Sequence, residues 1–374
     1  MRDVAEIDQA PPEVTDVFHR LNVRAPVELE LLGTAFEKIL HVEDAHLRDL
    51  LLSGFLMSVM TKGPELQEIE ALLRVAFSLD GFSPSDAVKV RLPRKEKLIG
   101  CAGSGKKGTK TMNISTPSAL LAAAAGVYVS KTGSSSTSSI SGSADFLSTA
   151  GANLRLPVAE MVAVLKRLRF GFFRIEALVP NFDRVYGGRF HAPHALSFAL
   201  AGLVTPIHLD HRLYGLSHPN VEMSLKVFRR FGVENALVVS STHDDIHYID
   251  EMGIYGTTRL MGMRNGRIGR LLYLDPTVIL RLPRYTPKDL AQGRNLRENV
   301  AIGLRALRGA GPQSIKDVVC INAANLMVLA EKADDLRHGF SLAKSAMRKG
   351  LAIELLESFI DSTGGDVAEL HARI

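Results

Sequence analysis

A glycine-rich loop with two lysines, Gly103-Ser-Gly-Lys-Lys-Gly108, follows a short apolar run and leads into Asn113-Ile-Ser-Thr116. Glycine lets the backbone approach an anion closely, and the exposed amides of a helix N-terminus favour negative charge. The loop can therefore be interpreted as a phosphate cradle. A glycine-rich turn with two solvated lysines fits the local pattern equally well, because the loop lacks the spacing of a triphosphate loop or a dinucleotide fingerprint.

A serine- and threonine-rich tract between residues 130 and 148 is the one low-complexity stretch of the sequence. Its composition alone is typical of a flexible linker. However, it joins a strand-like segment, GVYVS, to a helix-like segment, SADFLSTAG, and its turn contains Lys131. Hydroxyls and a lysine at the carboxyl end of a parallel strand suit phosphate oxygens, so we favour a second phosphate-binding turn.

An acidic loop, Asp244-Asp-Ile-His-Tyr-Ile-Asp-Glu251, follows the buried-strand pattern Ala236-Leu-Val-Val239. Neighbouring carboxylates on such a loop can hold Mg²⁺, which prefers hard oxygen ligands. Acidic loops are more often merely solvated, but the two phosphate-like loops favour the metal interpretation.

Several histidines fall in the middle of the chain with a recurring HxxH spacing. No cysteine or acidic partner stands at a zinc-site interval, so we expect surface or hydrogen-bonded loop histidines rather than a zinc site. The histidines are His191, His194, His208, His211, His243 and His247.

The composition limits the class of protein. Of the 374 residues, 46% are hydrophobic and 23% charged, which predicts a folded chain with one large domain and a small one. The formal net charge of +5 allows anionic partners without requiring them. Two cysteines are too few for a disulfide framework, and no secretory signal is recognisable at the start, so we expect a cytoplasmic location. No apolar window reaches the ~18 residues of a membrane span.

The apolar pattern changes along the chain. Between Phe36 and Leu79 it has helical spacing with a break at Gly63 and Pro64, which predicts a compact helical hairpin or bundle. Short apolar runs then precede glycine-rich turns and helical stretches, in LIGCAGSG, ALLAAAAGVYVSKTG and NALVVSS. This repetition predicts an α/β fold with a mostly parallel central sheet flanked by helices. Further amphipathic helices are expected near residues 298–307, 316–332 and 340–359.

Together these motifs resemble the anthranilate phosphoribosyltransferase family (glycosyltransferase family 3), which shares a fold with the pyrimidine nucleoside phosphorylases. The resemblance covers about residues 36–360, and its most specific parts are NISTPSALLAAAAGVYVSKTGSSSTSSISGSADFLSTAG and DVVCINAANLMVLAEKADDLRHGFSLAKSAMRKGLA. It implies a small helical domain hinged to a larger α/β domain, with phosphoribosyl pyrophosphate and Mg²⁺ bound between them. We expect an extension at 1–30, a helical domain at 31–95 joined by about 170–200, and an α/β domain at 96–169 and 201–374.

The resemblance also implies roles for individual residues at matching positions. The positions of the diphosphate loop are Gly103, Ser104, Gly105, Lys106, Lys107 and Gly108. The Asn-x-Ser-Thr element and the following phosphate turn supply Asn113, Ser115, Thr116, Lys131, Gly133 and Ser143. The metal ligands fall on Asp250 and Glu251, with Ser115 as a third and Asp244 and Asp245 as the competing choice. Arg189 falls where the family keeps an arginine for the carboxylate of the aromatic acceptor.

The sequence departs from the family pattern at both phosphate loops. Lys106 and Lys107 replace the last glycine and the aspartate of the usual Gly-Thr-Gly-Gly-Asp loop. Thr132 and Ser134 replace the histidine and asparagine that line the family's acceptor pocket. The sequence therefore does not identify the acceptor substrate. The basic glycine loop also resembles a divergent branch of this fold noted for binding nucleic acid.

We therefore expect a Mg²⁺-dependent phosphoribosyltransferase acting on an aromatic amine, anthranilate or a related acceptor, with a role in tryptophan biosynthesis. Lys131, the loop amides and Mg²⁺ would stabilise the departing pyrophosphate, and Arg189 would orient an acidic acceptor. The alternative is a catalytically silent relative that binds nucleic acid through basic groups such as those at Arg91–Lys97 and Arg264–Arg270. A homodimer through the amino-terminal helices is expected in the enzyme.

Overall fold

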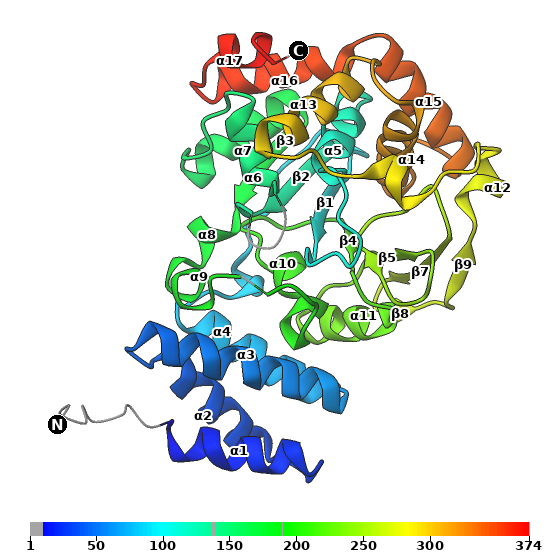
Figure 1. Ribbon diagram of the computed structural model, residues 1–374. Coiled ribbons are helices and arrows are strands. Elements are labelled where there is room, and N and C mark those ends of the chain that lie inside the picture. The colour runs from blue at the N-terminus through cyan, green and yellow to red at the C-terminus, as the bar shows by residue number, and fades with distance from the viewer. Residues whose placement is uncertain (1–9, 137–139, 189, 374) are drawn as a thin grey trace.

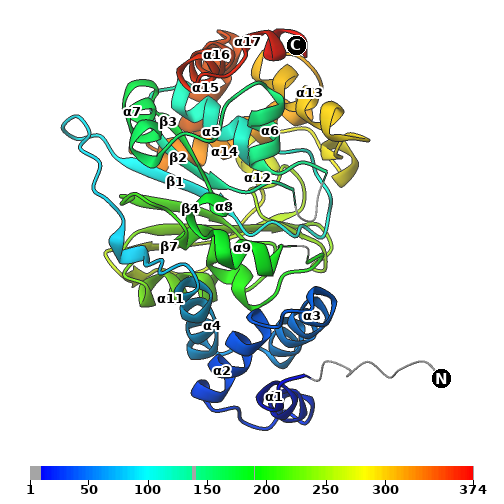
Figure 2. The ribbon, with the colours of Figure 1, turned by 90° about the vertical axis from the view of Figure 1, so that its left-hand side faces the viewer.

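The computed structural model describes residues 10–136, 140–188 and 190–373. The amino-terminal helices form a bundle on one side of the molecule, and the carboxyl-terminal helices lie on the opposite side of a central sheet (Figure 1, Figure 2). No helix in these ranges has both the length and the apolar content needed to cross a membrane.

The central sheet has its parallel strands in the order β3-β2-β1-β4-β5, and antiparallel β7 pairs with β5 at one side. The strands are β1 (Leu98–Gly103), β2 (Tyr128–Gly133), β3 (Phe170–Arg174), β4 (His211–Gly215), β5 (Ala236–Thr242), β6 (Tyr248–Ile249), β7 (Thr257–Arg264), β8 (Arg267–Ile268) and β9 (Leu272–Leu274). This arrangement confirms the predicted α/β fold with a mostly parallel sheet.

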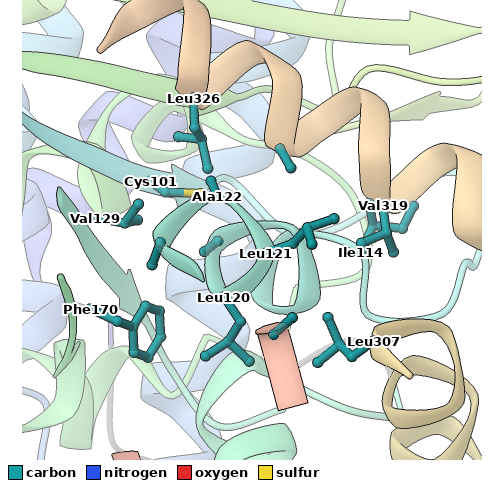
Figure 3. Packing of buried hydrophobic residues seen from close by; sticks show 14 of the residues in the cluster. Cys101, Ile114, Leu120, Leu121, Ala122, Val129, Phe170, Leu307, Val319 and Leu326 are labelled. Atoms are coloured by element: carbon teal, nitrogen blue, oxygen red, sulfur yellow. The ribbon is translucent and has the colours of Figure 1, made fainter. Parts of the chain in front are cut away.

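Helix α5 (Ser115–Ala124) lies at the centre of the larger hydrophobic core. Its residues from Thr116 to Ala123 are all buried, as expected for a helix with apolar side chains on every face. Figure 3 shows Leu120 pointing toward Phe170 of the sheet and Leu121 toward Val319 of the carboxyl-terminal layer. Packing on both sides fixes the helix, and with it the N-terminus at Ser115.

The helices that cover α5 and the adjoining sheet face come mainly from the last part of the chain. They are α6 (Ser143–Thr149), α7 (Val158–Leu168), α13 (Leu296–Leu307), α14 (Gln313–Leu329), α15 (Leu336–Arg348), α16 (Leu351–Ser362) and α17 (Val367–His371). Short segments outside these layers are the 3-10 turns Pro84–Asp86 and Pro287–Leu290 and helix α12 (Pro276–Leu280).

A second hydrophobic core joins the amino-terminal bundle to the other face of the sheet. Its buried side chains come from the bundle, from the segment between β3 and β4, and from α11. The helices are α1 (Pro12–Asn22), α2 (Leu29–Leu40), α3 (Ala45–Lys62), α4 (Leu66–Ser78), α8 (Ile175–Leu178), α9 (Pro180–Tyr186), α10 (Leu200–Leu203) and α11 (Val221–Arg230), with a 3-10 turn at Ala195–Phe198.

Elements that differ from the sequence-based expectation include α1, the helix expected at 340–359 and β4. Helix α1 forms inside the predicted extension and packs on the bundle, because Val14, Val17 and Leu21 lie on one buried face. The helix expected at 340–359 is two helices, since Gly350 has a φ of 74°, which an α-helix cannot contain. Strand β4 carries no plain apolar pattern, because its first two residues are His211 and Arg212.

Candidate active site

A cavity lies at the carboxyl ends of β1 and β2, where ligands commonly bind in parallel α/β folds. Its walls come from the glycine-rich loop, the turn before α5, the serine-rich turn after β2 and the end of the acidic loop. The structure thereby brings most of the predicted site residues together. They are Gly103, Ser104, Gly105, Lys106, Lys107, Asn113, Ser115, Lys131, Gly133, Ser143, Asp250 and Glu251.

Two predicted residues, Gly108 and Thr116, are not among the residues lining this cavity. The Gly108 amide donates to the Tyr248 carbonyl at 2.8 Å, which ties the loop to the acidic segment. The Thr116 amide donates to Asn113 Oδ1 at 3.2 Å, inside the first turn of α5. Both residues hold the walls of the cavity in place. The predicted Arg189 lies outside the described residues.

The carboxylate of Asp250 anchors the glycine-rich loop. The amide of Gly105 donates to Asp250 Oδ2 at 2.8 Å, and the same oxygen lies only 2.5 Å from where a Cβ on Gly103 would stand. A Cβ on Gly215 would meet the Asp250 carbonyl oxygen at 1.6 Å. Glycine at these two strand ends is therefore required for Asp250 to reach the loop.

Asp244 and Asp245, the alternative choice of metal ligands, do not line the cavity. Asp244 accepts from the amide and from Nδ1 of His247, at 2.8 and 2.6 Å, and these bonds lower its pKa. Asp245 pairs with Arg259 at 2.8 Å. Neither aspartate is among the residues lining the cavity, whereas Asp250 and Glu251 are.

Lys107 forms an ion pair with both cavity carboxylates. Its Nζ lies 2.7 Å from Glu251 Oε1 and 3.5 Å from Asp250 Oδ1, and it also donates to Thr111 Oγ1 at 2.9 Å. Burial and the neighbouring Asp250 charge raise the pKa of Glu251 to about 8. Although burial alone disfavours the Asp250 charge, Lys107 and the Gly105 amide hold the pKa of Asp250 below its ordinary value.

The pair has the oxygen chemistry that Mg²⁺ prefers. Asp250 Oδ1 and Glu251 Oε2 are buried and have no hydrogen-bond partner among the described residues. Within the same ranges, however, no third histidine, cysteine or carboxylate completes a metal-binding group. The Lys107 ammonium already forms ion pairs with both carboxylates, so the pair as arranged does not fit a divalent cation. The predicted ligation by Asp250 and Glu251 requires Lys107 to leave.

Lys106, the other loop lysine, faces a different part of the cavity. It has a left-handed backbone, with φ of 57°, and its Nζ lies 5.7 Å from the centre of the Tyr186 ring. Burial lowers the pKa of Lys106 to about 8, against the opposing effect of Asp250. Tyr186 stacks on Phe182, which also lines the cavity. This aromatic wall could not be predicted from the sequence, because α9 lies in a weakly patterned segment.

Lys131 stands at the end of β2 and is 2% exposed. Its Nζ donates to the Thr132 carbonyl at 3.0 Å. No carboxylate of the described residues forms an ion pair with it, although a buried cation is costly without an anion nearby. Its position in the cavity lining leaves this charge for an anionic ligand.

The turn before α5 is tied to the serine-rich turn. Asn113 Nδ2 donates to the Gly142 carbonyl at 3.1 Å, while its Oδ1 accepts from the Thr116 amide in the first turn of α5. Gly142 lies so close to the turn that a Cβ would meet the Ser134 carbonyl at 2.4 Å. The two predicted phosphate turns are therefore held against each other.

His194 is fully buried against the aromatic wall. Its Nε2 and the Tyr186 hydroxyl lie 2.8 Å apart, and its ring packs on Phe190 with centroids 4.5 Å apart. Burial, and secondarily the charge of Lys106, lower the pKa of His194 well below its ordinary value.

The buried His194 predicts an acid-sensitive fold. Because its pKa is lower in the folded than in the unfolded chain, its contribution to stability is complete above the unfolded pKa of about 6.5 and declines as the pH falls. As the pH falls below about 6.5, we expect the free energy of unfolding to decline, because the unfolded chain binds a proton that the buried ring excludes. Urea unfolding at several pH values measures this loss. The variant His194→Gln should show a shallower decline, and an unchanged slope would contradict the assignment.

The chain matches the family model described as "Glycosyl transferase family, a/b domain" over residues 95–353. It belongs to this family. The resemblance inferred from its motifs is thereby confirmed.

Similar curated proteins include anthranilate phosphoribosyltransferases. That of Pelotomaculum thermopropionicum is 32% identical over 84% of this chain and 87% of its own length. That of Petrotoga mobilis is 29% identical over 90% of this chain and 93% of its own length.

Solved structures of the same name share the fold. The Thermus thermophilus enzyme is 25% identical with a TM-score of 0.71, covering 93% of this chain and 99% of that one. The Saccharomyces cerevisiae enzyme, in complex with PRPP and Mg, is 19% identical with a TM-score of 0.74, covering 94% and 98%.

Proposed function

We propose that this protein is a phosphoribosyltransferase that transfers the 5-phosphoribosyl group from phosphoribosyl pyrophosphate to an aromatic amine and releases pyrophosphate. The observation that carries the proposal is the cavity in which the glycine-rich loop, the Asn113 turn and the Lys131 turn meet. The names of the related proteins and the PRPP bound to the yeast enzyme support it.

The chemistry requires stabilisation of an anionic leaving group. The anomeric carbon of the ribose gains positive charge as the diphosphate leaves, and fixed donors aimed at the diphosphate lower the barrier. We assign this role to the Lys131 ammonium and to the amides of Lys106 and Lys107, which have no acceptor among the described residues. The N-terminus of α5 adds a favourable dipole.

The acceptor occupies the aromatic half of the cavity in this proposal. Phe182 and Tyr186 offer ring faces to an aromatic acceptor, and Lys106 offers a positive charge beside them. An aromatic amine of low basicity is already unprotonated at neutral pH, so the reaction needs no strong general base. Lys106 would take over the orientation of an acidic acceptor that the sequence assigned to Arg189.

Replacing Lys106 with methionine tests this role. We expect the KM for a carboxylated aromatic amine such as anthranilate to rise by roughly 10- to 100-fold, the equivalent of one hydrogen bond to a charged group. The KM for aniline, which has no carboxylate, should change little.

In the unmodified protein, affinity for the carboxylated acceptor should fall as the pH rises through about 8, where Lys106 loses its proton. Equal loss for both acceptors would contradict a charge-specific role.

Mg²⁺ is the proposed cofactor, in keeping with the yeast structure that contains PRPP and Mg. When bound, it would neutralise part of the diphosphate charge. Of the predicted ligands we retain Ser115, which lines the cavity at the start of α5, together with the oxygens of the substrate. Asp250 and Glu251 are engaged by Lys107.

An acceptor screen that follows pyrophosphate release tests the proposed function. The full chain, phosphoribosyl pyrophosphate and Mg²⁺ are incubated with anthranilate and with other aromatic amines in turn. Release that depends on one acceptor supports the proposal and identifies that acceptor. The absence of release with every amine would contradict it. Anthranilate as acceptor would support the predicted role in tryptophan biosynthesis.

We also propose a homodimer located in the cytoplasm. Exposed apolar side chains on the amino-terminal bundle, Leu29 and Leu50, support an interface there, and sedimentation tests it. Cys101 and Cys320 are both free and buried, which is consistent with a reducing compartment, and cell fractionation tests this location.

The nucleic-acid alternative has no observation in its favour: Lys97 and Arg264, two of its basic residues, both pair with Glu331.

A further inference from the structure

We propose that Lys107 is a built-in cation that replaces a metal ion between Asp250 and Glu251. The carboxylate pair then binds no divalent cation, and any Mg²⁺ that the protein uses arrives with the diphosphate of its substrate. The inference concerns the chain's own charges and holds whether or not the proposed transferase activity is found.

The position of the ammonium is the first argument. Lys107 Nζ lies within ion-pair distance of both carboxylates, at 2.7 Å from Glu251 Oε1 and 3.5 Å from Asp250 Oδ1. A metal ion bridging the same groups would need the same space. An ammonium this close would also repel a divalent cation strongly in a partly desolvated site.

Burial is the second argument. The side chains of Asp250 and Glu251 are 6% and 5% exposed and that of Lys107 is 16% exposed, so the ammonium offsets the carboxylate charge largely out of water. A buried carboxylate charge beside a second carboxyl group is costly without a cation. Lys107 supplies it from the loop itself, with the Thr111 hydroxyl as a further hydrogen-bond partner at 2.9 Å.

The cavity carboxylates also keep oxygens without a hydrogen bond, and the chemistry of these oxygens identifies what the lysine replaces. Asp250 Oδ1 and Glu251 Oε2 are buried, and no described residue hydrogen-bonds to them. Such oxygens are ligands for a hard divalent cation. Removing the ammonium should therefore uncover a metal site rather than leave an inert cavity.

Mn²⁺ binding to the full chain, followed by the EPR signal of free Mn²⁺ without phosphoribosyl pyrophosphate, tests the proposal. The unmodified protein should show no site that depends on Glu251. Lys107→Ala should gain one Mn²⁺ site, with affinity increased by roughly tenfold or more through loss of the like charge. Adding Glu251→Gln to this variant should remove the site. Lys332→Ala, which frees the partly exposed carboxylate of Glu96, serves as the matched control and should gain none.

Two results would overturn the proposal. One is a Mn²⁺ site in the unmodified protein that Glu251→Gln abolishes, because the lysine would then not exclude the metal. The other is a folded Lys107→Ala variant without a new site. If Lys107→Ala does not fold, the comparison of the unmodified protein with Glu251→Gln still decides the question. Neither measurement depends on activity. A failure of this proposal can therefore be told apart from a failure of the proposed transferase function.

Discussion

Replacing Lys131 with methionine is expected to lower the rate of pyrophosphate release by about 10²- to 10³-fold, the usual effect of removing one donor that stabilises developing negative charge. Methionine keeps the length of the apolar stem. Stability should stay the same or rise, because the substitution removes a buried cation that has no carboxylate partner among the described residues. Steady-state kinetics and urea unfolding on the same preparation measure the two effects.

A matched control is available outside the cavity. Lys344 lies on α15, where its ammonium sits 5.4 Å from the centre of the Phe340 ring, and it does not line the cavity. Lys344→Met should leave the rate unchanged. A Lys131→Met variant with normal activity, or one whose lost activity follows unfolding, would show that Lys131 has only a structural role.

Replacing Lys107 with methionine is expected to destabilise the fold by about 3 kcal/mol, because it leaves the buried Asp250 carboxylate without its cation. Its Nζ contacts both Glu251 and Asp250, and the side chains of these partners are almost fully buried. Denaturant unfolding at neutral pH measures the loss. Lys332→Met, which breaks a more exposed pair with Glu96, should cost at most about 1 kcal/mol.

A double variant separates the charge effect from lost packing. Lys107→Met combined with Asp250→Asn should lose less stability than Lys107→Met alone, since an amide needs no counterion and its oxygen can still accept from Gly105. Equal losses in the single and the double variant would mean that packing of the lysine stem, not its charge, holds the loop.

The sequence predicted the elements that have a strong local signal. Gly63 and Pro64 marked the boundary between α3 and α4, and apolar runs before glycine turns marked β1, β2 and β5. Strand β4 was missed because tertiary contacts, not its composition, bury it. Arg212, for example, donates from Nε to the Gly202 carbonyl. Such a partner cannot be recognised from local pattern.

The loops of the candidate site were predicted from the sequence, but the contacts between them were not. Residue types and turns identified the loops at Gly103 and Lys131, which do line one cavity. The choice of Asp250 over Asp244 could not be made from local pattern, because it depends on the close approach of Gly103 and Gly215. The ion pair between Lys107 and Glu251 joins residues 144 positions apart, so only the fold reveals it.

Calorimetric titration of the full chain with phosphoribosyl pyrophosphate, with and without Mg²⁺, tests most directly whether these loops form one diphosphate site. We predict a measurable heat of binding at one site per chain, strongly weakened in Lys131→Met and kept in Lys344→Met. The absence of any heat under both conditions, or equal binding by Lys131→Met, would contradict the account.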